Sequence, residues 1–223
     1  MTNIRPLNIQ DIETLDDDIR LINKRQKFQI KYFSGYAALV IIGSTWAYFK
    51  IDSGNFWVWV FTSIGFFVAG LWGFLEMFLE DNKALKRIEW LKNENKVISI
   101  IVKSTDYIEI PEHEDEGDYF LFQLLDNKIL YFGGQEFTTS DTFPNSNFEI
   151  VIARDPKNKI VLLNKYDFGD KISPKIKLTK SQSIKLSDKQ IEEIQKQDVV
   201  VREFATFITG DINEIKIVDK ADT

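Results

Sequence analysis

The chain has 223 residues, a formal net charge of −6, no cysteine and a single histidine, His113. The lack of thiols excludes disulfides and cysteine nucleophiles, and a single imidazole excludes any site that needs two. Residues 1–79 carry seven basic and seven acidic side chains, so the whole acidic excess lies in residues 80–223. Nucleic acid is therefore not an expected partner, because phosphate binding needs clustered lysine and arginine.

The first thirty-one residues are largely polar and predict an amphipathic helix. Within residues 8–24, apolar side chains recur at helical spacing: Ile12, Leu15, Ile19 and Ile22. Asn8 or Asp11 is suited to cap the start of this helix. We interpret residues 1–31 as a cytoplasmic amphipathic N-terminal helix.

Two uncharged stretches follow, residues 32–49 and 56–75, with a six-residue connection between them. At about 1.5 Å of rise per residue, each is long enough to cross a hydrocarbon core roughly 30 Å thick. Two buried helices of a soluble core would carry a polar stripe, which neither stretch has. The pattern predicts a transmembrane hairpin over residues 32–79.

The distribution of positive charge predicts the orientation of this hairpin. Lysines and arginines precede the first span and follow the second, whereas the connection holds only Lys50. By the positive-inside rule, both termini then face the cytoplasm of a bacterial inner (plasma) membrane. Residues 80–95 are expected to form a cytoplasmic linker helix, which we expect to pack on the N-terminal helix rather than lie among the headgroups.

Small residues recur along one face of each predicted span: Gly35, Gly43 and Ala47 in the first, and Gly65, Ala69 and Gly73 in the second. Small side chains let helix backbones approach closely in lipid, where packing drives association. We interpret both stripes as packing the hairpin against itself, in preference to the association of two copies.

Beyond residue 95 the apolar period shifts from 3.6 towards 2, which predicts a β-rich domain over residues 96–223. Strands are predicted at 97–103, 106–110, 118–125, 128–133, 147–153, 159–164, 174–178, 199–207 and 214–219. A turn at Asp155-Pro156-Lys157-Asn158 predicts a hairpin between two of them.

The strands on either side of Asp126-Asn127 are apolar on both faces and are expected to be central in their sheet. One short helix is predicted after Ser187, which begins a capping box that ends at Gln190. The expected fold is an α+β membrane protein with a mainly antiparallel cytoplasmic domain, either a barrel or a sandwich.

An acidic loop follows the second predicted strand and holds Glu112, His113, Glu114, Asp115, Glu116 and Asp118. Carboxylate oxygens are suited to a divalent cation. The loop lacks the ordered spacing of an EF-hand, and runs of charge are usually solvated turns. We therefore favour a solvated loop over a metal site, and no cofactor is expected.

Residues 115–150 contain a series of short motifs in a fixed order: DEG, then a YF strand, a GQ turn, and FPN followed by FEI. This pattern resembles an uncharacterised bacterial family of proteins, some with a membrane hairpin, to which no activity is attached. The resemblance implies that this region is part of a single domain.

The residue types and their spacing do not indicate a catalytic set of nucleophile, base and orienting group. We therefore interpret the chain as non-enzymatic. It is expected to be an integral inner-membrane protein that presents a small cytoplasmic binding or scaffolding module. The expected partners are the lipid bilayer and a protein or second copy, with any small-molecule ligand unspecified.

Two alternatives remain. The first is a ligand-gated membrane effector that oligomerises through its hairpin, similar in architecture to bacterial anti-phage effectors that bind a cyclic nucleotide. The second is a hydrolase at the membrane surface that uses the acidic loop as a metal site.

Overall fold

The computed structural model describes residues 2–50, 56–111, 117–125, 127–135, 137, 139–197 and 205–219. The chain divides into two compact units, Pro6–Lys96 and a second unit that joins the N-terminal strand to residues from Val97 onward. The sequence-based boundary at residue 96 therefore leaves out one strand of the β domain.

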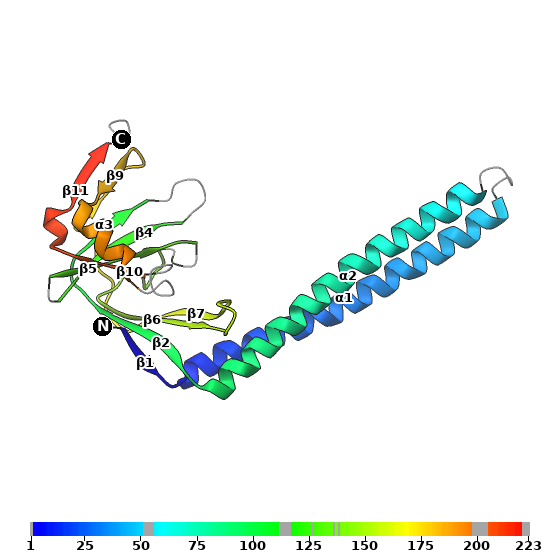
Figure 1. The fold of residues 1–223 in the computed structure, drawn as a ribbon, viewed down its shortest axis with the longest axis horizontal. Coiled ribbons are helices and arrows are strands. Elements are labelled where there is room, and N and C mark those ends of the chain that lie inside the picture. The colour runs from blue at the N-terminus through cyan, green and yellow to red at the C-terminus, as the bar shows by residue number, and fades with distance from the viewer. Residues whose placement is uncertain are drawn as a thin grey trace. The chain divides into compact units, whose positions relative to one another are not determined.

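The helical unit consists of two long helices that lie side by side (Figure 1), α1 (Ile9–Lys50) and α2 (Phe56–Glu94). Each contains one predicted span together with the predicted polar extension, without a break. Asn8 caps α1, because its Oδ1 accepts from the Asp11 N–H at 2.8 Å and its own N–H donates to Asp11 Oδ2 at 2.9 Å. Asn95, with a φ of 52°, follows the end of α2 and accepts from the Leu7 N–H at 3.0 Å.

Polar contacts join the two extensions, as expected for helices that pack on each other. Lys92 Nζ lies 2.6 Å from Asp16 Oδ1. Nearer the apolar zone, the buried carboxylate of Asp81 accepts from Arg25 at 3.1 Å and from Gln29 Nε2 at 3.1 Å. Since a buried carboxylate is costly without partners, these bonds fix the register of α2 on α1.

The β unit contains two larger sheets, one antiparallel and one mixed (Figure 1). The first has the order β1–β2–β6–β7, with bounds Thr2–Arg5, Val97–Lys103, Asn147–Arg154 and Ile160–Asp167. The second has the order β10–β5–β4–β3–β8, with bounds Ala205–Thr209, Lys128–Gly133, Tyr119–Leu124, Tyr107–Ile110 and Ile176–Lys177. Among the described strands, β3 and β8 are the one pair that runs parallel.

The two sheets pack face to face through an aromatic core. Phe148 of the first sheet lies 5.0 Å from the Phe122 ring and 5.5 Å from the Phe132 ring of the second. Tyr107 belongs to this core. Its burial, and to a smaller extent the negative charge of Glu109, raise the pKa of the Tyr107 hydroxyl to about 12. This arrangement is a sandwich, and the described strands form no closed barrel.

The five-stranded sheet also buries its other face. Leu121, Ile129 and Ile208 pack there beneath a ribbon of β9 (Gln182–Lys185) and β11 (Lys216–Asp219). Ile194 of α3 (Asp188–Gln195) and Ile212 of a short 3-10 helix (Ile212–Glu214) join the same cluster. Burial on both faces confirms the prediction that β4 and β5 are central.

Most predicted elements are found. The predicted turn at Asp155 and the predicted helix cap at Ser187 also make the hydrogen bonds that the sequence indicates. The Asn158 N–H donates to the Asp155 carbonyl at 2.9 Å and closes the β6–β7 hairpin. The capping box at Ser187 and Gln190 is present. Two strands, β1 and β9, were not predicted, and only residues 205–207 of the predicted strand 199–207 lie among the described residues.

A buried ion pair fastens the N-terminal strand to the sheet. Glu149 Oε1 accepts from Arg5 Nε at 2.6 Å and from Ser99 Oγ at 2.5 Å. The residues come from β1, β6 and β2, so this bond set crosses three adjacent strands. Both charged side chains are largely shielded from water.

Replacing this arginine tests how far β1 depends on the pair. Arg5→Ala leaves the Glu149 carboxylate buried without its cation and should lower the unfolding free energy by about 3 kcal/mol. The measurement is denaturant unfolding of the full chain, with exposed Lys157→Ala as the control. A loss under about 1 kcal/mol would mean that water or another group replaces the cation.

Candidate membrane segment and binding groove

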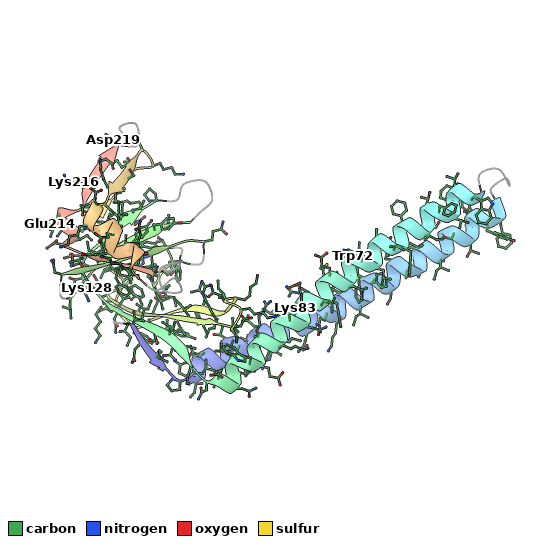
Figure 2. The ribbon with its side chains drawn as sticks, in the orientation of Figure 1. Trp72, Lys83, Lys128, Glu214, Lys216 and Asp219 are labelled. Atoms are coloured by element: carbon green, nitrogen blue, oxygen red, sulfur yellow. The ribbon has the colours of Figure 1, made fainter. Side chains whose placement is uncertain are left out.

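The outside of the helix pair is apolar over the two predicted spans. Large side chains from both helices are exposed, among them Leu39, Ile42, Phe61 and Phe66. Trp72 of α2 is 73% exposed and labelled in Figure 2, which shows side chains along the outside of the pair. Exposure of such an apolar surface to water is unfavourable in free energy, so this surface is a candidate for contact with lipid.

Among the described residues, one helix is long and apolar enough to cross a membrane, the segment Trp57–Glu94 of α2. None of its most apolar window is buried. Of the two predicted spans, residues 32–49 and 56–75, only the second lies in a helix that meets this criterion. Residues 32–49 fall short because hydroxyl-bearing and small residues dilute their aliphatic core: Ser34, Gly35, Tyr36, Ser44 and Thr45.

The two helices interlock through aromatic side chains. The Phe33 ring stacks on Phe74 at 4.7 Å and lies 6.2 Å from Phe67. One turn further, the Tyr36 hydroxyl donates to the Phe66 carbonyl, and its ring covers Gly70. A Cβ on Gly70 would lie 2.8 Å from Tyr36 Cζ, so this position requires glycine for the helices to stay this close.

The four glycines of the predicted small-residue stripes do not lie against a neighbouring group. A Cβ built on Gly35, Gly43, Gly65 or Gly73 meets nothing within 4 Å. Ala69 is exposed, and Ala47 alone of the six predicted residues is buried. The glycine that does pack, Gly70, was not in the predicted set because the spacing of small residues does not tell which face meets the partner helix.

The acidic loop lies mostly outside the described residues, which exclude Glu112, His113, Glu114, Asp115 and Glu116. Asp118, at its end, accepts from the Thr139 hydroxyl at 3.4 Å. Within the described ranges no three His, Asp or Glu side chains gather as metal ligands would. The metal hypothesis for this loop stays a prediction.

The residues of the DEG…GQ…FPN…FEI pattern have structural roles. Gly117 (φ +84°) and Gly134 (φ +120°) touch, because a Cβ on the first would lie 2.6 Å from the second's carbonyl oxygen. Phe143 and Phe148 are core residues whose rings meet edge to face at 5.4 Å.

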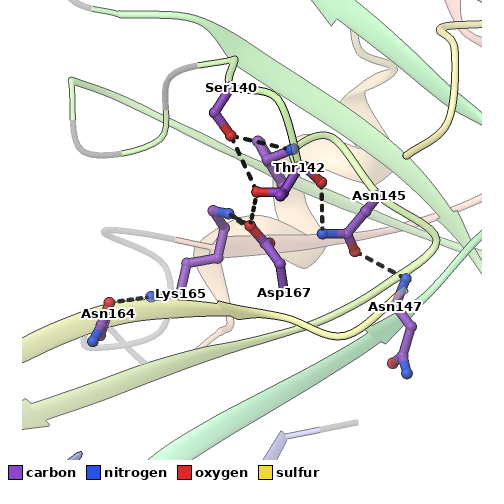
Figure 3. A network of polar contacts seen from close by, with 8 residues as sticks. Ser140, Thr142, Asn145, Asn147, Asn164, Lys165 and Asp167 are labelled. Atoms are coloured by element: carbon purple, nitrogen blue, oxygen red, sulfur yellow. Dashed lines mark hydrogen bonds and ion pairs between the residues drawn. The ribbon is translucent and has the colours of Figure 1, made fainter. Parts of the chain in front are cut away.

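The segment around Phe143 is held by the polar network in Figure 3. Asp167 accepts from the Thr142 hydroxyl at 3.0 Å and pairs with Lys165 Nζ at 2.6 Å. Lys165 Nζ also lies 4.0 Å from the centre of the Phe143 ring. Asn145 is fully buried and ties this segment together through Thr142. These contacts give the described residues of this segment a role in folding.

A half-open groove of about 730 Å³ lies at one end of the sandwich. Side chains from four strands and a turn line it: Ile101, Lys103, Leu124, Leu125, Lys128 and Phe207. Thr2 and Asn3 of β1 complete the described lining. Sequence reasoning did not find this groove, because its residues are far apart in the chain and form no motif.

Comparison with protein families, curated proteins and solved structures finds no match for this chain. Two features of the described chain bear on its function, the exposed apolar surface of the helix pair and the groove.

The contact between Tyr36 and Gly70 can be tested with a matched pair of substitutions. Gly70→Leu should lower the stability of the helix pair by about 1–3 kcal/mol, because the added side chain displaces the Tyr36 ring. Gly65→Leu points into open space and should cause no loss. The measurement is unfolding of the full chain in mixed detergent micelles. Equal effects of the two substitutions would contradict this packing.

Proposed function

We propose that this chain is an inner-membrane protein whose helix pair crosses the bilayer as a hairpin and presents a β-sandwich binding module to the cytoplasm. The observation that carries the proposal is the exposed apolar surface of α2. In the most apolar window of this helix, no residue is buried. A helix that served as the core of a soluble domain would instead be covered.

Crossing by α1 follows from its attachment to α2. Five residues, 51–55, separate the helices, and Phe33 of α1 stacks on Phe74 of α2. If α2 crosses the bilayer, the paired part of α1 must lie at the same depth. The lower hydropathy of α1 is compatible with lipid, because the hydroxyl groups of Ser34, Tyr36 and Thr45 already have partners.

Those partners are backbone carbonyls. Ser34 Oγ donates to the Ile30 carbonyl and Thr45 Oγ1 to the Ile41 carbonyl, each at 2.8 Å. The Tyr36 hydroxyl donates to α2, as described above. These bonds remove much of the cost of placing hydroxyl groups in hydrocarbon.

Charge supports the orientation. Lys24, Lys27 and Lys31 are exposed on α1 just before its apolar segment, and Lys83 and Lys86 are exposed after that of α2. Basic side chains at these positions favour the cytoplasmic face. The sandwich, which both ends of the hairpin adjoin in sequence, then lies in the cytoplasm.

The role proposed for the sandwich is binding rather than catalysis. Its groove combines two lysines with aliphatic and aromatic side chains, and the described lining contains no nucleophile paired with a base.

A second candidate function is a ligand-gated effector that oligomerises in the membrane. One observation favours it: Gly65 and Gly73 of α2 are open to an approaching helix. Such positions permit close contact between two copies in lipid.

Topology is tested by cysteine accessibility, because the natural chain has no cysteine. In intact cells, a membrane-impermeant maleimide should label Ser53→Cys in the connection. It should label Ser181→Cys on the sandwich only after the membrane is permeabilised. Labelling of Ser181→Cys in intact cells, or of neither position before permeabilisation, would contradict the proposed arrangement.

A further inference from the structure

We propose that the groove at the end of the sandwich binds a small organic anion with an apolar body. Lys103 and Lys128 would hold the anionic group, and Leu124, Leu125 and Phe207 would pack against the apolar part. The inference rests on the proposed role of the sandwich as a binding module and names the chemistry of its ligand.

The groove has the size and the construction of a ligand site. Its volume of about 730 Å³ lies within the range of roughly 300–1,000 Å³ typical of small-molecule pockets. It is built on strands of both sheets, so the backbone around it is held by the sandwich core. Figure 2 labels Lys128 at its place in the sandwich.

The charge of the groove differs from that of the rest of the domain. Residues 97–223 hold 16 basic and 23 acidic side chains, yet the described lining is basic and contains no carboxylate. Some lysines of the domain are paired with a carboxylate, as Lys165 is with Asp167 and Lys177 with Glu109, a bond that raises the pKa of Lys177. Within the described part of the chain, neither Lys103 nor Lys128 has an ion-pair partner. Two such lysines favour an anionic ligand.

The apolar lining indicates the other half of the ligand. Leu125 is 79% exposed and Ile101 is 47% exposed, although both belong to residue types that are usually buried. An alkyl or aromatic group seated between them would remove this surface from water. A bare inorganic anion would leave it exposed.

The edge of β10, where Phe207 lies, argues against a peptide that pairs with this strand. Such a peptide would need the backbone groups of β10 that face away from β5. That edge is already occupied: Gln197 accepts from the Phe207 N–H at 2.9 Å and donates to its carbonyl. Gln190 Nε2 donates to the next outward carbonyl, that of Thr209, at 3.2 Å. A small molecule needs no such pairing.

The test uses the full chain in lipid nanodiscs, with empty nanodiscs as background. Radiolabelled octanoate and hexyl phosphate are the probes, and octanol is the neutral analogue. We expect saturable binding of at least one anionic probe, no comparable binding of octanol, and at least tenfold weaker binding to Lys103→Gln/Lys128→Gln. Preference for one anionic probe identifies a carboxylate or a phosphate as the head group.

The control is the double variant Lys157→Gln/Lys159→Gln, which removes two exposed lysines of the β6–β7 turn. It has the same change of charge and should bind the probes normally. Leu125→Ser, at an exposed position, should weaken binding without affecting the fold. Absence of saturable binding, or equal loss in the control variant, overturns the anion site. Neither result alters the maleimide labelling pattern, so the membrane proposal is judged separately.

Discussion

The apolar surface of the helix pair is the constraint on which the rest of the molecule depends. Both helices expose large apolar side chains over many turns. At about 25 cal/mol for each Å² of apolar surface left in water, this exposure is too costly for a solvated rod. Lipid removes the cost, provided that polar groups inside the apolar zone are satisfied. The hydroxyl groups of Ser34, Tyr36 and Thr45 meet this condition through backbone carbonyls.

The second constraint is how the helices are connected to the sandwich. Arg5 and Val97 are direct partners in the pairing of β1 with β2, so the helical unit is an insertion between two neighbouring positions of one sheet. The buried pair of Arg5 and Glu149 secures the entry strand. Leu7 and Asn95 then join the two ends of the helix pair. A fragment that begins at residue 96 lacks β1 and exposes the edge of β2.

Local sequence patterns predicted the bounds of several strands well, but they predicted poorly which helix face meets the partner helix. β2 and β5 begin and end where alternation of apolar residues placed them, because Val97–Lys103 and Lys128–Gly133 pack in the pleated, buried surfaces that this pattern indicates. β1 has four residues and is defined by pairing with a strand beyond the hairpin, which no local window detects. Of the predicted packing residues, Ala47 is buried, whereas Gly35, Gly43, Gly65 and Gly73 face open space and the Tyr36 ring covers Gly70 instead. The groove joins residues from distant strands and leaves no signal in the sequence.

The central claim is that lipid solvates the outer surface of α2, and a spin label at Ile64 tests it most directly. Ile64 is exposed at the middle of the apolar segment, and Ile64→Cys gives a single labelling site because the chain has no other cysteine. In reconstituted protein, collision with oxygen should greatly exceed collision with a water-soluble nickel chelate, as expected in hydrocarbon. A label that collides preferentially with the nickel chelate would place this surface in water and contradict the account.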